Sequence, residues 1–137
     1  MGQRSTDRGF RLIRSAHDCS DGGFGVALAE CCFDTEGVGA DVLIKYTEVC
    51  GHEAVNDAAT LFGESASRVI VSAGPESVAG VLQQAGAAGV PAIVIGQTGG
   101  NRVRVATTAR TLVDVSVLDA ERMWASALER PLARRVA

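Results

Sequence analysis

The sequence predicts an α+β domain in which helices pack on a mixed β-sheet. Its 137 residues suit one compact domain. Short β-branched apolar runs alternate with segments in which apolar residues recur at helical spacing. Glycines and prolines separate these segments, as they do between the elements of a small globular fold. The 47% of hydrophobic and 21% of charged residues agree with a soluble globular protein.

The first half of the chain is expected to contain two strands and two helices. We predict a strand over 12–16, a helix over 24–33, a strand over 38–44 and a helix over 53–62. Ser20 or Asp21 is expected to cap the first helix. Gly63 is expected to end the second in the left-handed conformation. Residues 1–9 are predicted to be a disordered leader, and 10–137 to form the single domain.

The second half is expected to begin with a buried strand over 69–73 and a helix that Pro75 opens and Gly89 ends. A strand over 92–95 and a hairpin turn over 99–101 would lead into a strand over 102–106. A further strand over 112–117 precedes a helix capped by Asp119, whose buried stripe would include Met123, Trp124, Ala127 and Leu128. The strand–helix–strand–strand order of 69–106 is part of a ferredoxin-like arrangement.

Composition argues against several classes of function. The net charge is −3 and basic residues form no tract, so nucleic acid is not an expected partner. Apolar runs are shorter than a membrane span and the first residues are polar, which favours a cytoplasmic protein. The four cysteines have neither zinc-site spacing nor an ordinary disulfide pattern, so we expect reduced, mostly buried thiols.

The first candidate segment is a glycine-rich turn that enters a helix, SAHDCSDGG over 15–23. Such a turn leaves backbone N–H groups that can face an anion. Asp18 and Asp21 would oppose a phosphate unless Mg²⁺ lay between them. In an extended segment His17 and Asp18 point to opposite faces and cannot form a relay. The alternative is structural: a helix cap, close packing at the glycines, and a histidine at a strand end.

The second candidate segment is a helix-to-strand turn, LFGESASR over 61–68. It carries a carboxylate, two hydroxyls and a guanidinium on a loop between rigid elements, where ligand contacts are common. Arg68 would suit a phosphate or carboxylate in two-point contact. The alternative is a local ion pair of Glu64 with Arg68, while Ser65 and Ser67 satisfy turn backbone groups.

Both segments resemble blocks of the C-terminal domain of phosphoribosylformylglycinamidine synthases, in the aminoimidazole-ribonucleotide-synthase-like superfamily. VIGQTGGNRVRV and a Trp-containing helix extend the resemblance over roughly 12–132. Ala66 departs from it, because the family commonly has Gln there. The residues that match the family's HDxSDGG and GESxSR motifs are our candidates for substrate or nucleotide binding: His17, Asp18, Ser20, Asp21, Gly22, Gly23, Glu64, Ser65, Ser67 and Arg68.

The resemblance implies an ATP-dependent C–N ligase of purine biosynthesis that makes formylglycinamidine ribonucleotide from formylglycinamide ribonucleotide. It implies ATP and Mg²⁺ bound mainly by other domains, and as partners the remaining synthase domains or subunits and a glutaminase. Family domains begin with a helix before SAHD, so we expect a chain shortened at its N-terminal side and incomplete as a catalyst. The residues identify no catalytic group and no metal ligand.

Two alternatives remain open. One is a related enzyme domain of the same superfamily, including a small-molecule kinase. The other is a non-catalytic nucleotide-binding or dimerisation module. In each case we expect the glycine turn and the serine-arginine turn to lie together along one rim, facing a nucleotide.

Overall fold

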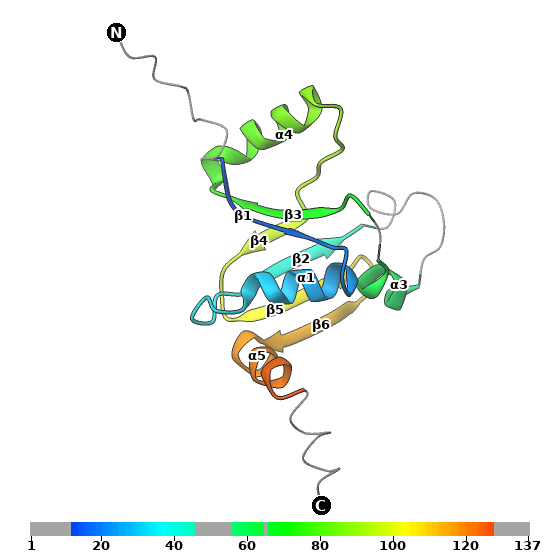
Figure 1. Ribbon diagram of the computed structural model, residues 1–137, viewed down its shortest axis with the longest axis vertical. Helices are drawn as coiled ribbons and strands as arrows, with labels where there is room; N and C mark the ends of the chain where they lie inside the picture. The colour runs from blue at the N-terminus through cyan, green and yellow to red at the C-terminus, as the bar shows by residue number, and fades with distance from the viewer. Residues whose placement is uncertain (1–11, 46–55, 65, 128–137) are drawn as a thin grey trace, which may run out of the picture.

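The computed structural model describes residues 12–45, 56–64 and 66–127, and it confirms an α+β domain with helices on a mixed sheet. None of the helices in these ranges is long and apolar enough to cross a membrane. The elements, drawn in Figure 1, are β1 (Ile13–Asp18), α1 (Gly23–Cys32), β2 (Ala40–Ile44), α3 (Asp57–Phe62), β3 (Val69–Ala73), the 3₁₀ turn η2 (Pro75–Ser77), α4 (Val78–Ala87), β4 (Gly96–Thr98), β5 (Arg102–Thr107), β6 (Thr111–Ser116) and α5 (Val117–Ala125).

A four-stranded sheet in the order β4-β2-β5-β6 forms the larger layer of the fold. Strands β2 and β5 are parallel, while β4 and β6 pair antiparallel with β2 and β5 respectively. On β2, Ala40, Val42 and Ile44 are buried and the residues between them are exposed. This alternation gives the sheet one buried face, as expected from the twofold side-chain period of a strand.

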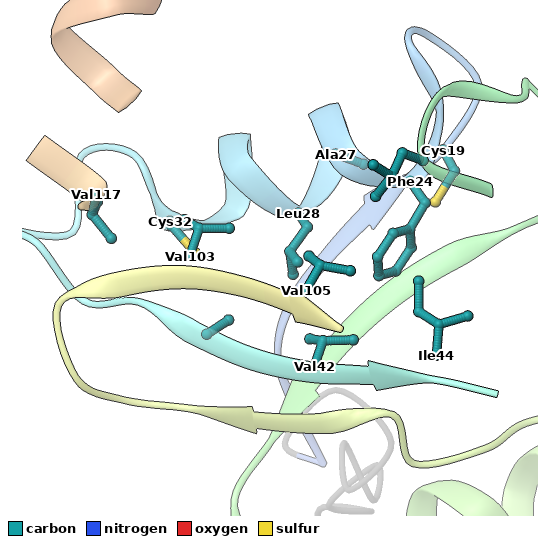
Figure 2. Close-up of a cluster of buried hydrophobic side chains, with 12 residues drawn as sticks. Cys19, Phe24, Ala27, Leu28, Cys32, Val42, Ile44, Val103, Val105 and Val117 are labelled. Carbon is teal, nitrogen blue, oxygen red and sulfur yellow. The ribbon is translucent and has the colours of Figure 1, made fainter. Parts of the chain in front are cut away.

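Helix α1 covers the buried face of this sheet (Figure 1). Its Phe24, Ala27 and Leu28 are buried, and Figure 2 shows them above Val42 and Val105 of the two central strands. The spacing of three and four residues puts these side chains on one helix face. Small side chains along α1 let the helix approach the sheet closely, so the core forms with few aromatic rings.

Strands β1 and β3 form a separate antiparallel ribbon. Ile70 packs against the main core, but Val69 is 57% exposed and Val71 is 42% exposed. The prediction of a buried β3 was therefore wrong. Alternate residues of a strand face opposite sides, and within the described residues only one side of this ribbon rests on the core.

The ferredoxin-like expectation for residues 69–106 holds for the order of elements but not for their pairing. β3 pairs with β1, whereas β4 and β5 lie in the other sheet. The predicted hairpin is also wrong, because β2 lies between β4 and β5. The strand expected over 92–95 begins only at Gly96. Local patterns identify strands but do not determine which strands pair.

Three helix boundaries differ from the expectation. Gly22, in the left-handed conformation, caps α1 without a side-chain hydrogen bond, in place of Ser20 or Asp21. Gly63 ends α3 in an extended conformation with φ −65°, and not in the left-handed one. Ser116 caps α5 by accepting from the backbone N–H of Asp119.

The last two helices contribute few buried residues. Within α4 no residue is fully buried, although Val78 and Val81 are half-buried. On α5 Met123 is 63% exposed and Trp124 is 54% exposed, so the expected buried stripe is wrong for both. Ala127 is also exposed, and Leu128 lies outside the described residues, as do residues 1–9. Val117 is the buried residue of α5.

Candidate functional site

The ribbon register brings the two candidate turns together. Asp18, the last residue of β1, pairs with Val69, the first residue of β3. In an antiparallel pair, the residues that follow one strand lie beside those that precede the other. The backbone N–H of Cys19 accordingly donates to the carbonyl of Arg68 at 3.0 Å. We call residues 19–23 together with Gly63, Glu64, Ser67 and Arg68 the two-turn junction.

Glu64 forms a side-chain bridge across the junction. Its Oε1 accepts a hydrogen bond from the backbone N–H of Gly22 at 3.1 Å. Gly22 is the N-cap of α1, so this N–H lies at the end of the helix where backbone donors have no intrahelical partner. A carboxylate at this end is also favoured by the helix dipole. Glu64 therefore occupies part of the anion-binding capacity that the glycine turn offers.

Glycine is needed where α1 meets the end of α3. Gly23 has φ +77°, and a Cβ there would lie 2.7 Å from the carbonyl carbon of Phe62. At Gly25 a Cβ would lie 3.2 Å from the carbonyl oxygen of Leu61. These contacts involve backbone atoms, which cannot turn away as a flexible side chain can. Glycines 23 and 25 thus allow the two helices to approach closely.

Arg68 is held within the junction. Its Nη2 donates to the carbonyl oxygen of Gly63 at 2.8 Å. Its Nε is buried, and no group among the described residues accepts a hydrogen bond from it. Burial raises the pKa of the neighbouring Cys19 thiol, and the charge of Arg68 partly offsets that rise. The guanidinium therefore braces the turn that follows α3, while the backbone carbonyl of Arg68 accepts from Cys19 just after β1.

The remaining polar candidates of this region are exposed. Asp18, Ser20, Asp21 and Ser67 all face solvent. Ser67 has φ +68°, which is uncommon for a residue other than glycine. Ser65 lies outside the described residues. The structure thus brings exposed carboxylates and hydroxyls to one place, and whether they contact a ligand stays a prediction.

His17 points away from the two-turn junction. Its Nε2 lies 2.9 Å from Oε2 of Glu30 on α1, and its Nδ1 is 2.6 Å from the carbonyl oxygen of Asp18. It lines a pocket together with Glu30 and residues of α5. The sequence correctly predicted that His17 and Asp18 do not form a relay. It did not identify Glu30, because thirteen positions separate it from His17 and no local pattern links the two.

The described cysteines agree with the prediction of reduced, buried thiols. Cys19 and Cys32 are buried, Cys31 is partly buried, and all three are free. Burial raises the pKa of each of these thiols. Cys50 lies outside the described residues. Within the ranges that the structure covers, no group of three or more His, Cys, Asp or Glu side chains is placed to hold a metal ion.

Comparison with known proteins identifies the family. Residues 6–107 match the family described as AIR synthase related protein, C-terminal domain. The chain belongs to this family. It is 35% identical over 134 residues to phosphoribosylformylglycinamidine synthase subunit PurL of Anaeromyxobacter sp. (strain Fw109-5). It is 42% identical over 102 residues to the PurL subunit of Methylocella silvestris.

These relatives are much longer than the chain. The Anaeromyxobacter match covers 91% of this chain but 16% of the relative, and the Methylocella match covers 74% and 13%. A solved structure, T. maritima PurL complexed with ATP, superposes with a TM-score of 0.67 at 21% identity. It matches 80% of this chain and 19% of that one. The structural likeness supports the fold of this AIR-synthase-related domain.

Proposed function

We propose that this chain acts as the C-terminal domain of a phosphoribosylformylglycinamidine synthase and needs the rest of that enzyme for catalysis. The observation that carries the proposal is the match to PurL subunits, which covers 91% of the chain at 35% identity and 16% of the relative. The synthase would use ATP and ammonia to convert formylglycinamide ribonucleotide into formylglycinamidine ribonucleotide. Its location would be the cytoplasm.

The chemistry of the described residues suits a supporting role in this reaction. Phosphoryl transfer needs phosphates bridged by metal ions and a positioned nucleophile. The described residues do not fit a self-contained Mg²⁺ site, because they hold no cluster of three or more such ligands. ATP and Mg²⁺ would therefore be held mainly by other domains, and a glutaminase would supply the ammonia.

We assign the two-turn junction to the nucleotide side of the assembled enzyme. Asp18, Asp21 and Glu64 make its surroundings acidic, which opposes direct binding of a bare phosphate. Carboxylates accept hydrogen bonds from hydroxyl groups, and the hydroxyls of Ser20 and Ser67 both donate and accept. These groups suit the ribose hydroxyls of a nucleotide. The buried Nε of Arg68 would donate a hydrogen bond to an acceptor on the adjoining domain and so hold the junction against that domain.

Reconstitution in trans tests the proposal. The 137-residue chain is mixed with a synthase that lacks the matching domain, and formylglycinamidine ribonucleotide and ADP are measured with ATP, Mg²⁺, substrate and ammonia. We expect product only when both parts are present. No product at saturating amounts of both parts would refute the proposal. Glutamine-dependent activity additionally requires the glutaminase.

Site variants test the role of the junction. Asp21→Asn should raise the KM for the nucleotide substrate in the reconstituted enzyme, because it removes an exposed negative charge beside α1 and replaces one accepting carboxylate oxygen with an amide donor. Glu76→Gln is the matched control, since Glu76 is an exposed carboxylate of η2 that forms an ion pair with Arg14, away from the two-turn junction. Equal kinetics for the two variants would contradict the assignment of the junction to nucleotide binding.

A second candidate is a non-catalytic assembly module. The exposed Val69 and Val71 of β3 favour association with another surface, because a two-stranded ribbon with an apolar outer face gains stability when it is covered. A chain that binds the remaining synthase and leaves its activity unchanged would favour this reading. The same reconstitution assay separates the two candidates.

A further inference from the structure

A pocket of about 420 Å³ lies apart from the two-turn junction, where α5 approaches β1 and the end of α1. His17 reaches it from the face of β1 opposite to Asp18, while Phe33 and Asp34 come from the turn after α1. Glu121 and Trp124 come from α5. Nothing in the proposed function uses this pocket.

The charge of the pocket wall is negative. Glu30, Asp34 and Glu121 contribute three carboxylates, and the lining residues, all from the described part of the chain, include no lysine or arginine. One carboxylate faces the imidazole of His17 at 2.9 Å. Another, on Glu121, accepts from the backbone N–H of Asp34 at 3.0 Å. These contacts fix two of the acidic groups at the pocket and leave an electrostatic environment that repels anions.

An aromatic wall is the second, independent feature. The rings of Phe33 and Trp124 lie 6.2 Å apart at an interplanar angle of 45°. Trp124 nevertheless keeps 54% of its surface exposed. An aromatic face attracts cations through its quadrupole, most strongly for tryptophan. A neutral apolar ligand would gain from the rings but would desolvate the carboxylates without compensation.

A bare metal ion fits poorly, because these acidic groups do not converge as a metal-ligand cluster within the described residues. An organic cation satisfies both features of the pocket at once. We propose that the pocket binds a guanidinium or alkylammonium group on a short aliphatic chain, carried either by a free molecule or by a second copy of this protein. The cation would lie over Trp124 with its charge toward Glu121 and Glu30.

Trp124 is the only tryptophan of the chain and therefore reports directly on the pocket. The full chain is titrated with butylguanidinium chloride at constant ionic strength while tryptophan emission is recorded. Butylurea, which has a similar shape but no charge, is the matched ligand control. We expect a saturable change in emission with butylguanidinium and none with butylurea. No saturable change, or an equal one with butylurea, would overturn the proposal.

Two variants on the same helix test the acidic contribution. Glu121→Gln removes the charge but keeps an oxygen that can accept from Asp34, so the fold is preserved. It should weaken butylguanidinium binding about two- to fivefold, the range expected for a partly exposed charge. Asp119→Asn makes the same change in net charge outside the pocket lining and should leave binding unchanged. Equal dissociation constants for Glu121→Gln and the unmodified chain would contradict the inference.

Dilution distinguishes the two sources of the cation. Emission of the probe-free chain that stays constant over about a hundredfold dilution indicates a site for a free molecule. Two results together assign the cation to a lysine or arginine of a second copy: the emission changes with dilution, and butylguanidinium reverses the association of the chains.

Discussion

Gly23→Ala tests the close approach that joins the two candidate turns. At φ +77° an alanine pays about 1–2 kcal/mol for the left-handed backbone. Its Cβ would also lie 2.7 Å from the carbonyl carbon of Phe62, 2.8 Å from its Cα and 3.0 Å from the carbonyl oxygen of Gly63. Relieving such overpacking by a backbone shift costs about 1–3 kcal/mol. We therefore expect the free energy of unfolding to fall by about 2–5 kcal/mol.

Gly100→Ala is the matched control for the conformational cost. Gly100 has φ +63°, and a Cβ there meets nothing within 4 Å. This variant should lose only about 1–2 kcal/mol, the cost of the left-handed backbone. Urea unfolding followed by far-UV circular dichroism measures both variants against the unmodified chain. If Gly23→Ala loses no more stability than Gly100→Ala, the backbone contact between α1 and the end of α3 does not constrain the junction as argued.

Three further predictions concern the hydrogen bond of Glu64, the pair of Arg102 and Asp114, and the buried cysteines. Glu64→Ala should speed amide hydrogen exchange at Gly22 and lower the free energy of unfolding by about 0.5–1.5 kcal/mol. Glu64→Gln should have smaller effects on both, because its amide oxygen still accepts from Gly22. Unchanged exchange at Gly22 in the alanine variant would contradict this. The hydrogen bond from Arg102 lowers the pKa of Asp114 in the folded protein. The pair of Arg102 and Asp114 therefore stabilises the fold above the unfolded-state pKa of Asp114, and this contribution is lost as pH falls through the lower folded-state pKa. A carboxylate NMR titration should show the Asp114 pKa rising in Arg102→Ala, and an unmoved midpoint would refute the pairing. Because burial raises their pKa, Cys19, Cys31 and Cys32 should react slowly with a disulfide reagent at pH 8 until the protein is denatured. Of the four cysteines, one lies outside the described residues, so fast reaction of two or more thiols in the native chain would contradict this for at least one of the three.

The sequence was informative where local patterns determine the outcome. The small-residue helix α1 appears within one residue of its expected bounds, because apolar spacing and the glycine turn before it are local signals. The strand expected over 102–106 likewise appears as β5, where the buried Val103 and Val105 alternate with exposed arginines. The two motif segments also identified the family that the comparison confirmed.

Strand pairing lay beyond the reach of these patterns. The sequence suggested a hairpin after β4, yet β4 pairs with β2, more than fifty positions earlier in the chain. It also predicted a buried β3, whereas Val69 and Val71 face outward. Pairing and exposure depend on which surfaces meet after the chain folds, and segments distant in sequence supply those surfaces.

The sequence by itself determined which residues carry the candidate chemistry: the acidic glycine turn and the turn that bears Glu64 and Arg68. The sequence also led us to expect these turns side by side, but only the tertiary structure decided how they meet, through the register of β1 on β3 and the hydrogen bond from Gly22 to Glu64. It also decided that His17 leaves them to pair with Glu30. The physical reason is that a strand sends successive side chains to opposite faces, while the neighbours on each face come from elements that no local spacing specifies.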